Sequence, residues 1–146
     1  LGLRSTSLRN LTEMWRILRP AGMLEIFLAS RQGELLGGLG VWQHAGVVVE
    51  WGSVQSERAR VEKLYCSDLL KWEVIRWGHG RGYRLYDLAG VAPDPDRADP
   101  KKRGIYQFKA KWGGRYRESQ VFFKPLKPLR HKILKLGSSL ARKLLG

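Results

Sequence analysis

Hydrophobic and polar residues follow two different periods along the first third of the chain. Apolar side chains recur at the three- and four-residue spacing of a helix at Leu11, Met14, Trp15 and Leu18. Three apolar runs follow, at residues 24–29, 35–42 and 47–51, and polar turns that contain glycine separate them. The first segment therefore predicts a helix capped by Asn10 or Thr12, and the three runs predict an antiparallel meander.

The middle of the chain returns to a helical period. Residues 55–63 are polar and charged, which predicts a loop or an exposed helical turn. Asp68 is a suitable N-cap for a helix whose apolar stripe is wide, and this width predicts that the helix packs hard on a sheet. The stripe consists of Leu70, Val74 and Trp77, widened by Leu69, Trp72 and Ile75. A strand over residues 83–88 follows, reached by this helical crossover.

After a loop rich in proline and aspartate, residues 104–112 have a helical period that Gly113 and Gly114 close. We expect a last strand over residues 117–124 and a basic amphipathic helix over residues 129–145. A meander followed by a helical crossover predicts an α/β fold, more closely an α+β arrangement with a mixed sheet and helices on its faces. The expected domains are residues 1–124 and the basic helix of residues 125–146.

Composition limits the class of protein. The chain has 146 residues, 43% of them hydrophobic, which is enough for one packed core. A net charge of +14 favours partners that carry phosphate. Cys66 is the only cysteine, so no internal disulfide forms, which is compatible with a cytoplasmic location; it is either a nucleophile or a small core residue. The chain starts at Leu1, and we expect it to be part of a longer protein that has a further N-terminal domain.

The sequence shows no signal peptide and no apolar run long enough to span a bilayer. His44, His79 and His131 lack the spacing of metal ligands, so we expect no metal site.

Lys109 is the first candidate for chemistry. Ile105, Phe108 and Trp112 share one helical face, and Lys109 borders it. Such a lysine either extends outward to solvent or points into a cleft, where it binds a carboxylate or phosphate or stabilises an oxyanion.

Other residues carry weaker signals. The run from Gly37 to Gly40 resembles a phosphate-binding loop but lies inside a strand pattern, so a β-bulge or a close backbone approach is the competing interpretation. Asp87 ends a strand, where it either binds substrate or caps a turn. Tyr106 lies among basic residues that suit stacking and phosphate binding. These basic residues are Lys101, Lys102, Arg103, Lys111 and Arg115.

The order of these residues resembles the FemABX aminoacyltransferases, which carry two GNAT-like domains. The resemblance covers residues 11–123, most of the second domain. The family pattern is a Leu-Leu-x-Trp-Glu-x-Ile-x-Trp helix, a Gly-Tyr pair, a Tyr-Asp strand end and a Phe-Lys pair before an aromatic-Gly-Gly. Here these are Leu69–Trp77, Gly82-Tyr83, Tyr86-Asp87 and Phe108-Lys109 ahead of Trp112.

This resemblance implies transfer of an amino acid from aminoacyl-tRNA to the stem peptide of a peptidoglycan precursor, either UDP-MurNAc-peptide or a lipid-linked form. It implies no cofactor and a role for Phe108 and Lys109 at the aminoacyl ester. Arg4, Trp51 and Ser53 correspond to positions that bind the precursor, although Leu8 stands where the family has a tyrosine.

Two other functions remain open. One is a GNAT-type N-acyltransferase that uses acyl-CoA, although residues 55–63 lack the glycines of a pyrophosphate loop. The other is a non-catalytic module that binds RNA or a membrane surface. The basic C-terminal helix either packs on the domain or docks on tRNA phosphates or on the anionic inner surface of the membrane, as a peripheral contact.

Overall fold

The computed structural model describes residues 7–92, 94, 97, 99–118, 124 and 126. The elements, in chain order, are α1 (Leu8–Leu18), β1 (Leu24–Arg31), β2 (Glu34–His44), β3 (Val47–Gln55), α2 (Glu57–Val61), α3 (Cys66–Gly80), β4 (Leu85–Asp87) and α4 (Pro100–Ala110). Arg4, most of the predicted strand over residues 117–124 and the predicted helix over residues 129–145 lie outside the described residues.

The antiparallel meander is confirmed. Strands β1, β2 and β3 pair in that order, and each hairpin turns through two residues. Gln32 and Gly33 have φ values of 53° and 81° in the first turn, and Ala45 and Gly46 have 49° and 79° in the second. Two consecutive positive φ angles suit the right-handed twist of a hairpin, so each turn sets the register of its strands.

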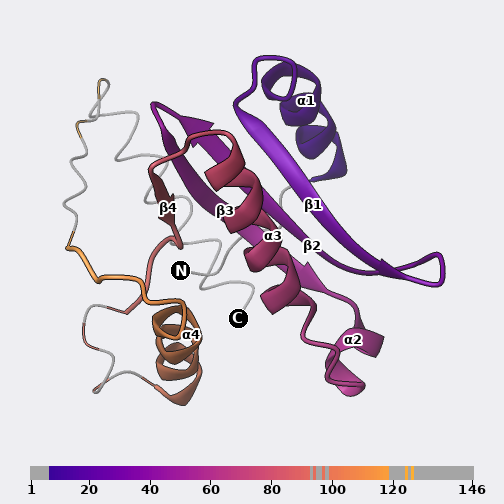
Figure 1. The fold of residues 1–146 in the computed structure, drawn as a ribbon, viewed down its shortest axis with the longest axis vertical. Helices are drawn as coiled ribbons and strands as arrows, with labels where there is room; N and C mark the ends of the chain where they lie inside the picture. The colour runs from indigo at the N-terminus through magenta and orange to yellow at the C-terminus, as the bar shows by residue number, and fades with distance from the viewer. Residues whose placement is uncertain are drawn as a thin grey trace, which may run out of the picture. The chain divides into compact units, whose positions relative to one another are not determined.

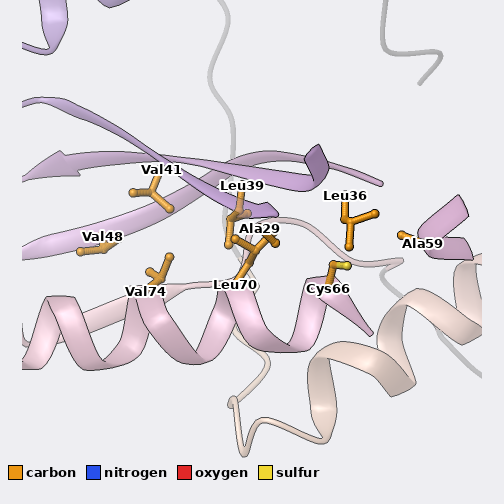
Figure 2. Packing of buried hydrophobic residues seen from close by; sticks show 9 residues of the cluster. All are labelled: Ala29, Leu36, Leu39, Val41, Val48, Ala59, Cys66, Leu70 and Val74. Atoms are coloured by element: carbon orange, nitrogen blue, oxygen red, sulfur yellow. The ribbon is translucent and has the colours of Figure 1, made fainter. Parts of the chain in front are cut away.

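The crossover and the mixed sheet are also confirmed. Helix α3 runs across the sheet (Figure 1) and leads to β4, which pairs in parallel with β3 at the edge of the sheet. The core lies between α3 and the strands, where Leu70 and Val74 point toward Leu39 and Val41, and Cys66 points toward Leu36 (Figure 2). Full burial of each large side chain contributes about 1.5–3 kcal/mol, so this interface holds the fold together. Cys66 is thus a core residue, 4% exposed.

The glycine run in β2 serves close packing of the backbone. A Cβ on Gly37 would lie 3.2 Å from the Cβ of Cys66, and one on Gly40 would lie 2.9 Å from the ring of Trp51. The register between β2 and β3 shifts next to Gly40, where Trp51 is the extra residue of a bulge. The interpretation as a bulge and a close approach is therefore confirmed.

Three helix starts differ from the prediction. Ser7, rather than Asn10 or Thr12, caps α1. Asp68 lies inside the first turn of α3, because Tyr65 takes the N-cap position in a left-handed conformation. The last helix begins at Pro100 rather than Gly104, because the Asp99 carboxylate accepts from the Lys102 amide and proline suits the first helical position.

The wide apolar stripe of α3 is only partly buried, which corrects the prediction that the whole stripe packs on the sheet. Leu70 and Val74 are buried, but Leu69 and Trp72 are 54% and 50% exposed. A helix that covers one face of a sheet buries only one side, so residues that widen the stripe fall outside the contact.

The chain divides into two compact units, Leu1–Gly114 and Arg115–Gly146. All helices and strands named above belong to the first unit. The prediction placed Arg117 and Glu118 in a strand over residues 117–124. In the structure these two residues, which belong to the second unit, are not part of a strand. The predicted division at residues 124 and 125 stays a prediction.

Gly40→Ala should destabilise the protein by about 1–3 kcal/mol, because the added methyl group would overlap a packed indole ring. Gly52→Ala is the matched control. It pairs with Gly40 across the strands, but a Cβ there meets nothing within 4 Å. Urea unfolding of both variants tests this, and equal losses of stability would contradict the packing argument.

Candidate active site

At the centre of the candidate site, β4 ends while β3 continues. They pair only from Val47 with Leu85 to Val49 with Asp87, while β3 continues to Gln55. Among the described residues, no part of β4 lies opposite the second half of β3. We call this point, where β3 continues past the end of β4, the fork. Glu50 is the first residue of β3 beyond the pairing.

A buried ion pair between Lys71 on α3 and Glu50 on β3 lies at the fork; we call its position the base of the fork. The Lys71 ammonium group donates to Oε2 of Glu50, and the two side chains are 3% and 10% exposed. Lys71 lies on the face of α3 that also carries Leu70 and Val74, so the packing of the helix carries it into the interior. Glu50 follows Val48 by two residues, so both point to the α3 side of the sheet.

Tyr86 joins this pair from the other strand. Its hydroxyl donates to the same Oε2 of Glu50 over 3.3 Å. Burial, and then the negative charge on Glu50, raise the pKa of Tyr86 well above its ordinary value of 10. The phenol therefore stays protonated and remains a donor, so Glu50 accepts from both α3 and β4.

Helix α4 lies against this cluster through Phe108. The ammonium nitrogen of Lys71 is 5.4 Å from the centre of the Phe108 ring, and that of Lys111 is 4.4 Å away. Lys111 also forms a 2.5 Å ion pair with Asp68 in the first turn of α3. The Lys71–Phe108 cation–π contact and the Lys111–Asp68 ion pair join α4 to α3, whereas the Lys111–Phe108 contact lies within the end of α4.

Lys109 points from α4 to the end of β4. Its ammonium group donates to the carbonyl oxygens of Gly90, over 2.8 Å, and Ala89, over 3.2 Å. Burial lowers the pKa of Lys109 below its ordinary 10.5. The charge on Lys71 lowers it further, while those on Glu50 and Asp87 oppose the change. The side chain thus points inward instead of extending outward to solvent.

This arrangement leaves Lys109 with one N–H donor beyond its two carbonyl contacts. An ammonium group has three N–H donors, and the two carbonyls use two of them. The third is available to an oxygen of a bound molecule, and the two contacts already fix its direction. A partly desolvated cation held in this way can stabilise negative charge that develops on a substrate oxygen.

The other predicted substrate residues are dispersed. Asp87 ends β4, and its Oδ1 accepts from the Ala89 amide, so it shapes the turn that Lys109 contacts. Trp51 packs on Trp42, with ring centres 5.1 Å apart, on the sheet face that Gly40 shares and that is opposite α3. Ser53 is exposed near the end of β3, and Tyr106 is half-buried on α4. Roles for these residues in substrate binding stay predictions.

The predicted phosphate-binding residues differ in their surroundings. Lys101, Lys102 and Arg103 lie in the first turn of α4, and Lys102 pairs with Asp99 over 2.8 Å. Lys111 pairs with Asp68, as described above. Arg115 is exposed and belongs to the second unit. Binding of phosphate by these residues stays a prediction.

Sequence reasoning missed the two most deeply placed charges, Lys71 and Glu50. The signal was present for both. Lys71 stands three residues before Val74 on the buried face of α3, and Glu50 stands two residues after Val48 on the inward face of β3. A charge at a position that the period assigns to the interior predicts a buried partner.

Two searches of the described part of the chain gave negative results. No three His, Cys, Asp or Glu side chains there lie close enough together to hold a metal ion. No helix in that part is both long and apolar enough to cross a bilayer.

Solved structures with the same architecture share little sequence with this chain. The aminoglycoside acetyltransferase AAC(6')-Iy in complex with a bisubstrate analogue of coenzyme A is 20% identical, with a TM-score of 0.56, and the match covers 87% of this chain and 84% of that one. The apo 6'-N-acetyltransferase AAC(6')-IG from Acinetobacter haemolyticus is 12% identical, with a TM-score of 0.59 and 85% of each chain covered. A transcriptional regulator from Bacillus halodurans is 16% identical, with a TM-score of 0.56, over 78% and 74% of the two chains. These similarities show the fold alone.

The sequence itself shows the family. A search of curated proteins finds no match to this chain. The profile of the acetyltransferase (GNAT) domain matches residues 3–124, which is most of the chain. This chain therefore belongs to the acetyltransferase (GNAT) domain family and is an acyltransferase.

Proposed function

We propose that this acyltransferase acts in the manner of the FemABX enzymes and transfers an amino acid from aminoacyl-tRNA to an amino group of a peptidoglycan stem-peptide precursor. The observation that carries the proposal is the position of Lys109. The family's Phe-Lys pair falls on Phe108 and Lys109, and these residues contact both the end of β4 and the base of the fork.

The other parts of the family pattern support this proposal by their positions. The Leu-Leu-x-Trp-Glu segment begins at Leu69 on α3, the Gly-Tyr pair precedes β4, and the Tyr-Asp pair ends it. Lys71 and Tyr86, from two of these segments, meet at Glu50, and Lys71 contacts Phe108 beside Lys109, whereas Tyr83 contacts Gln43 and Trp77 elsewhere. A chance match of short motifs gives no reason for these contacts around Lys71.

The proposed reaction is a direct acyl transfer. The amine of the acceptor attacks the ester carbonyl carbon, a C–N bond forms, and the bond from that carbon to the ribose oxygen of the tRNA breaks. The amine loses a proton and the leaving ribose oxygen gains one, so no covalent enzyme intermediate is required. Negative charge collects on the carbonyl oxygen in the transition state, and the third N–H of Lys109 supplies a donor for it.

Charges around α3 and α4 support a tRNA donor. Asp68 places a carboxylate in the first turn of α3, and residues 55–63 contain no glycine. A pyrophosphate at that helix end would meet a negative charge and a backbone shielded by side chains. By contrast, the first turn of α4 holds Lys101, Lys102 and Arg103, which the helix dipole disfavours and which a polyanion would stabilise.

For the acceptor, we propose that Trp51 and Ser53 line the precursor site, together with Arg4, which lies outside the described residues. The acceptor is UDP-MurNAc-peptide or its lipid-linked form. With the lipid-linked form, the enzyme would work at the cytoplasmic face of the membrane as a peripheral protein, where basic residues favour anionic lipid.

Lys109→Ala should reduce aminoacyl transfer by about a hundredfold, the effect of losing one donor to an oxyanion. Its fold should persist, because Ala89 and Gly90 are exposed and their carbonyls can bind water instead. Single-turnover transfer from aminoacyl-tRNA to UDP-MurNAc-peptide measures the effect, and urea unfolding checks stability.

Arg16→Ala is the control for that variant. It also removes one positive charge, but from the surface of α1, where the side chain is 69% exposed. It should leave transfer unchanged. Transfer by Lys109→Ala within a few-fold of the wild type would show that Lys109 only supports the turn after β4.

A second candidate function is N-acyl transfer from acyl-CoA. The observation that favours it is the fork itself, because β3 extends beyond the end of β4 and its backbone groups there, unpaired by β4, are able to bind an extended ligand. The family description as an acetyltransferase domain is consistent with this donor.

Calorimetry separates the two donors. We expect no saturable heat of binding for acetyl-CoA, because residues 55–63 contain no glycine that would let the backbone bind the pyrophosphate. The positive control is aminoacyl-tRNA titrated under the same conditions. Micromolar binding of acetyl-CoA would favour the second candidate and contradict the first.

A further inference from the structure

The Lys71–Glu50 pair is expensive to bury. Lys71 is 2% exposed as a residue, and the Glu50 side chain is 10% exposed. Removing an ion from water costs about several kcal/mol even in a relaxed protein, and an apolar pair of similar volume often stabilises a core as well or better. Stability alone therefore gives no reason for a lysine on the packed face of α3.

The location of the pair suggests another reason. Glu50 is the first β3 residue beyond the fork, Lys71 reaches it from α3, and Tyr86 reaches it from β4. Both donors use the same carboxylate oxygen. The pair thus connects α3, β3 and β4 next to the end of β4.

The pair also acts on α4. Lys71 lies 5.4 Å from the centre of the Phe108 ring, and Lys109 is the next residue along α4. The charges on Glu50 and Asp87 raise the pKa of Lys109, and the charge on Lys71 lowers it. Among the described residues, the charged groups that act on Lys109 are Glu50 on β3, Lys71 on α3 and Asp87 on β4, and Tyr86 on β4 contacts Glu50.

We propose that the buried Lys71–Glu50 pair is a positioning device for Lys109, which keeps the lysine on the carbonyls of Ala89 and Gly90 by balancing the charge below it. With both partners present, the attraction of Glu50 for Lys109 is offset by the repulsion from Lys71. The Lys109 ammonium group then stays on the two carbonyls, with its third donor directed to the substrate. The inference that this matters for catalysis rests on the proposed function, but the positioning itself does not.

The proposal predicts opposite effects from the two halves of one ion pair. Lys71→Met removes the positive charge next to Glu50, so the pKa of Lys109 should rise. In Glu50→Gln the attraction is lost, so the pKa of Lys109 should fall. A pair that only supports packing would lower stability in both variants and give no such difference in sign.

The experiment is an NMR titration of Lys109 in the full 146-residue chain. Lysine is incorporated with ¹³C and ¹⁵N labels, so that each Nζ keeps its own hydrogens, and Lys109→Arg identifies the signal. Opposite shifts of the Lys109 titration in Lys71→Met and Glu50→Gln support the proposal. Shifts of the same sign, or no shift in either variant, overturn it.

Two further variants keep the test decisive. Glu73→Gln breaks the exposed pair with Arg76 on the same helix and should leave the Lys109 titration unchanged. If the single variants fail to fold, the double variant Glu50→Gln/Lys71→Met replaces them, since it leaves no lone buried charge. Because the double variant removes one charge of each sign, the Lys109 titration should stay close to that of the wild type, and a large shift overturns the proposal.

Activity provides the second measurement. Transfer requires the ammonium form of Lys109. The alkaline limb of the pH–rate profile should therefore move to higher pH in Lys71→Met and to lower pH in Glu50→Gln. The rate on the plateau should fall about tenfold in both variants, since the donor is displaced. If the wild type transfers no aminoacyl group but the NMR shifts are opposite, the proposed function fails and the positioning device stands. If the variants transfer aminoacyl groups but the titration of Lys109 is unshifted in them, the proposed function stands and the positioning device fails.

Discussion

The burial of Lys71 between α3 and the sheet is the constraint on which the candidate site depends. The packing of Leu70 and Val74 on the strands carries the lysine into the interior, where a lone charge would be too costly to keep. Glu50 must therefore face it across the fork, and Tyr86 must stay protonated to share the carboxylate. The same interface that stabilises the domain thus fixes the position of each charge at the base of the site.

The sequence predicted the order of elements well, because period and turn residues are local signals. The meander, the crossover helix and the parallel last strand follow from runs of apolar residues and from the glycines between them. Helix starts were less predictable. Tyr65 holds the N-cap of α3 in a left-handed conformation, and local preferences alone would favour Asp68 for that position.

The site was predictable only in part, for a related reason. Lys109 borders an apolar face, so its unusual surroundings can be read from helical spacing. The partners that give it a direction, the carbonyls of Ala89 and Gly90, are backbone groups in a turn. Ala89 adopts a positive φ of 63°, which an alanine rarely takes and no sequence pattern indicates. Glu50 and Lys71 were missed because each looks ordinary until the interior face of its element is assigned.

The net charge of the whole chain is high, but few donors at the site are available to a substrate. The net charge and the donors therefore have separate roles. A net charge of +14 attracts any polyanion and acts over a distance that salt shortens. Close to the fork, however, Lys71 and Lys111 are paired with carboxylates, and Lys109 retains one donor beyond its two carbonyls. The total charge can therefore raise the rate of encounter with a nucleic acid, but it cannot choose the reacting group. In the proposed mechanism that choice rests on the donor that Lys109 directs at the end of β4, and the proposed role of the Lys71–Glu50 pair is to place it.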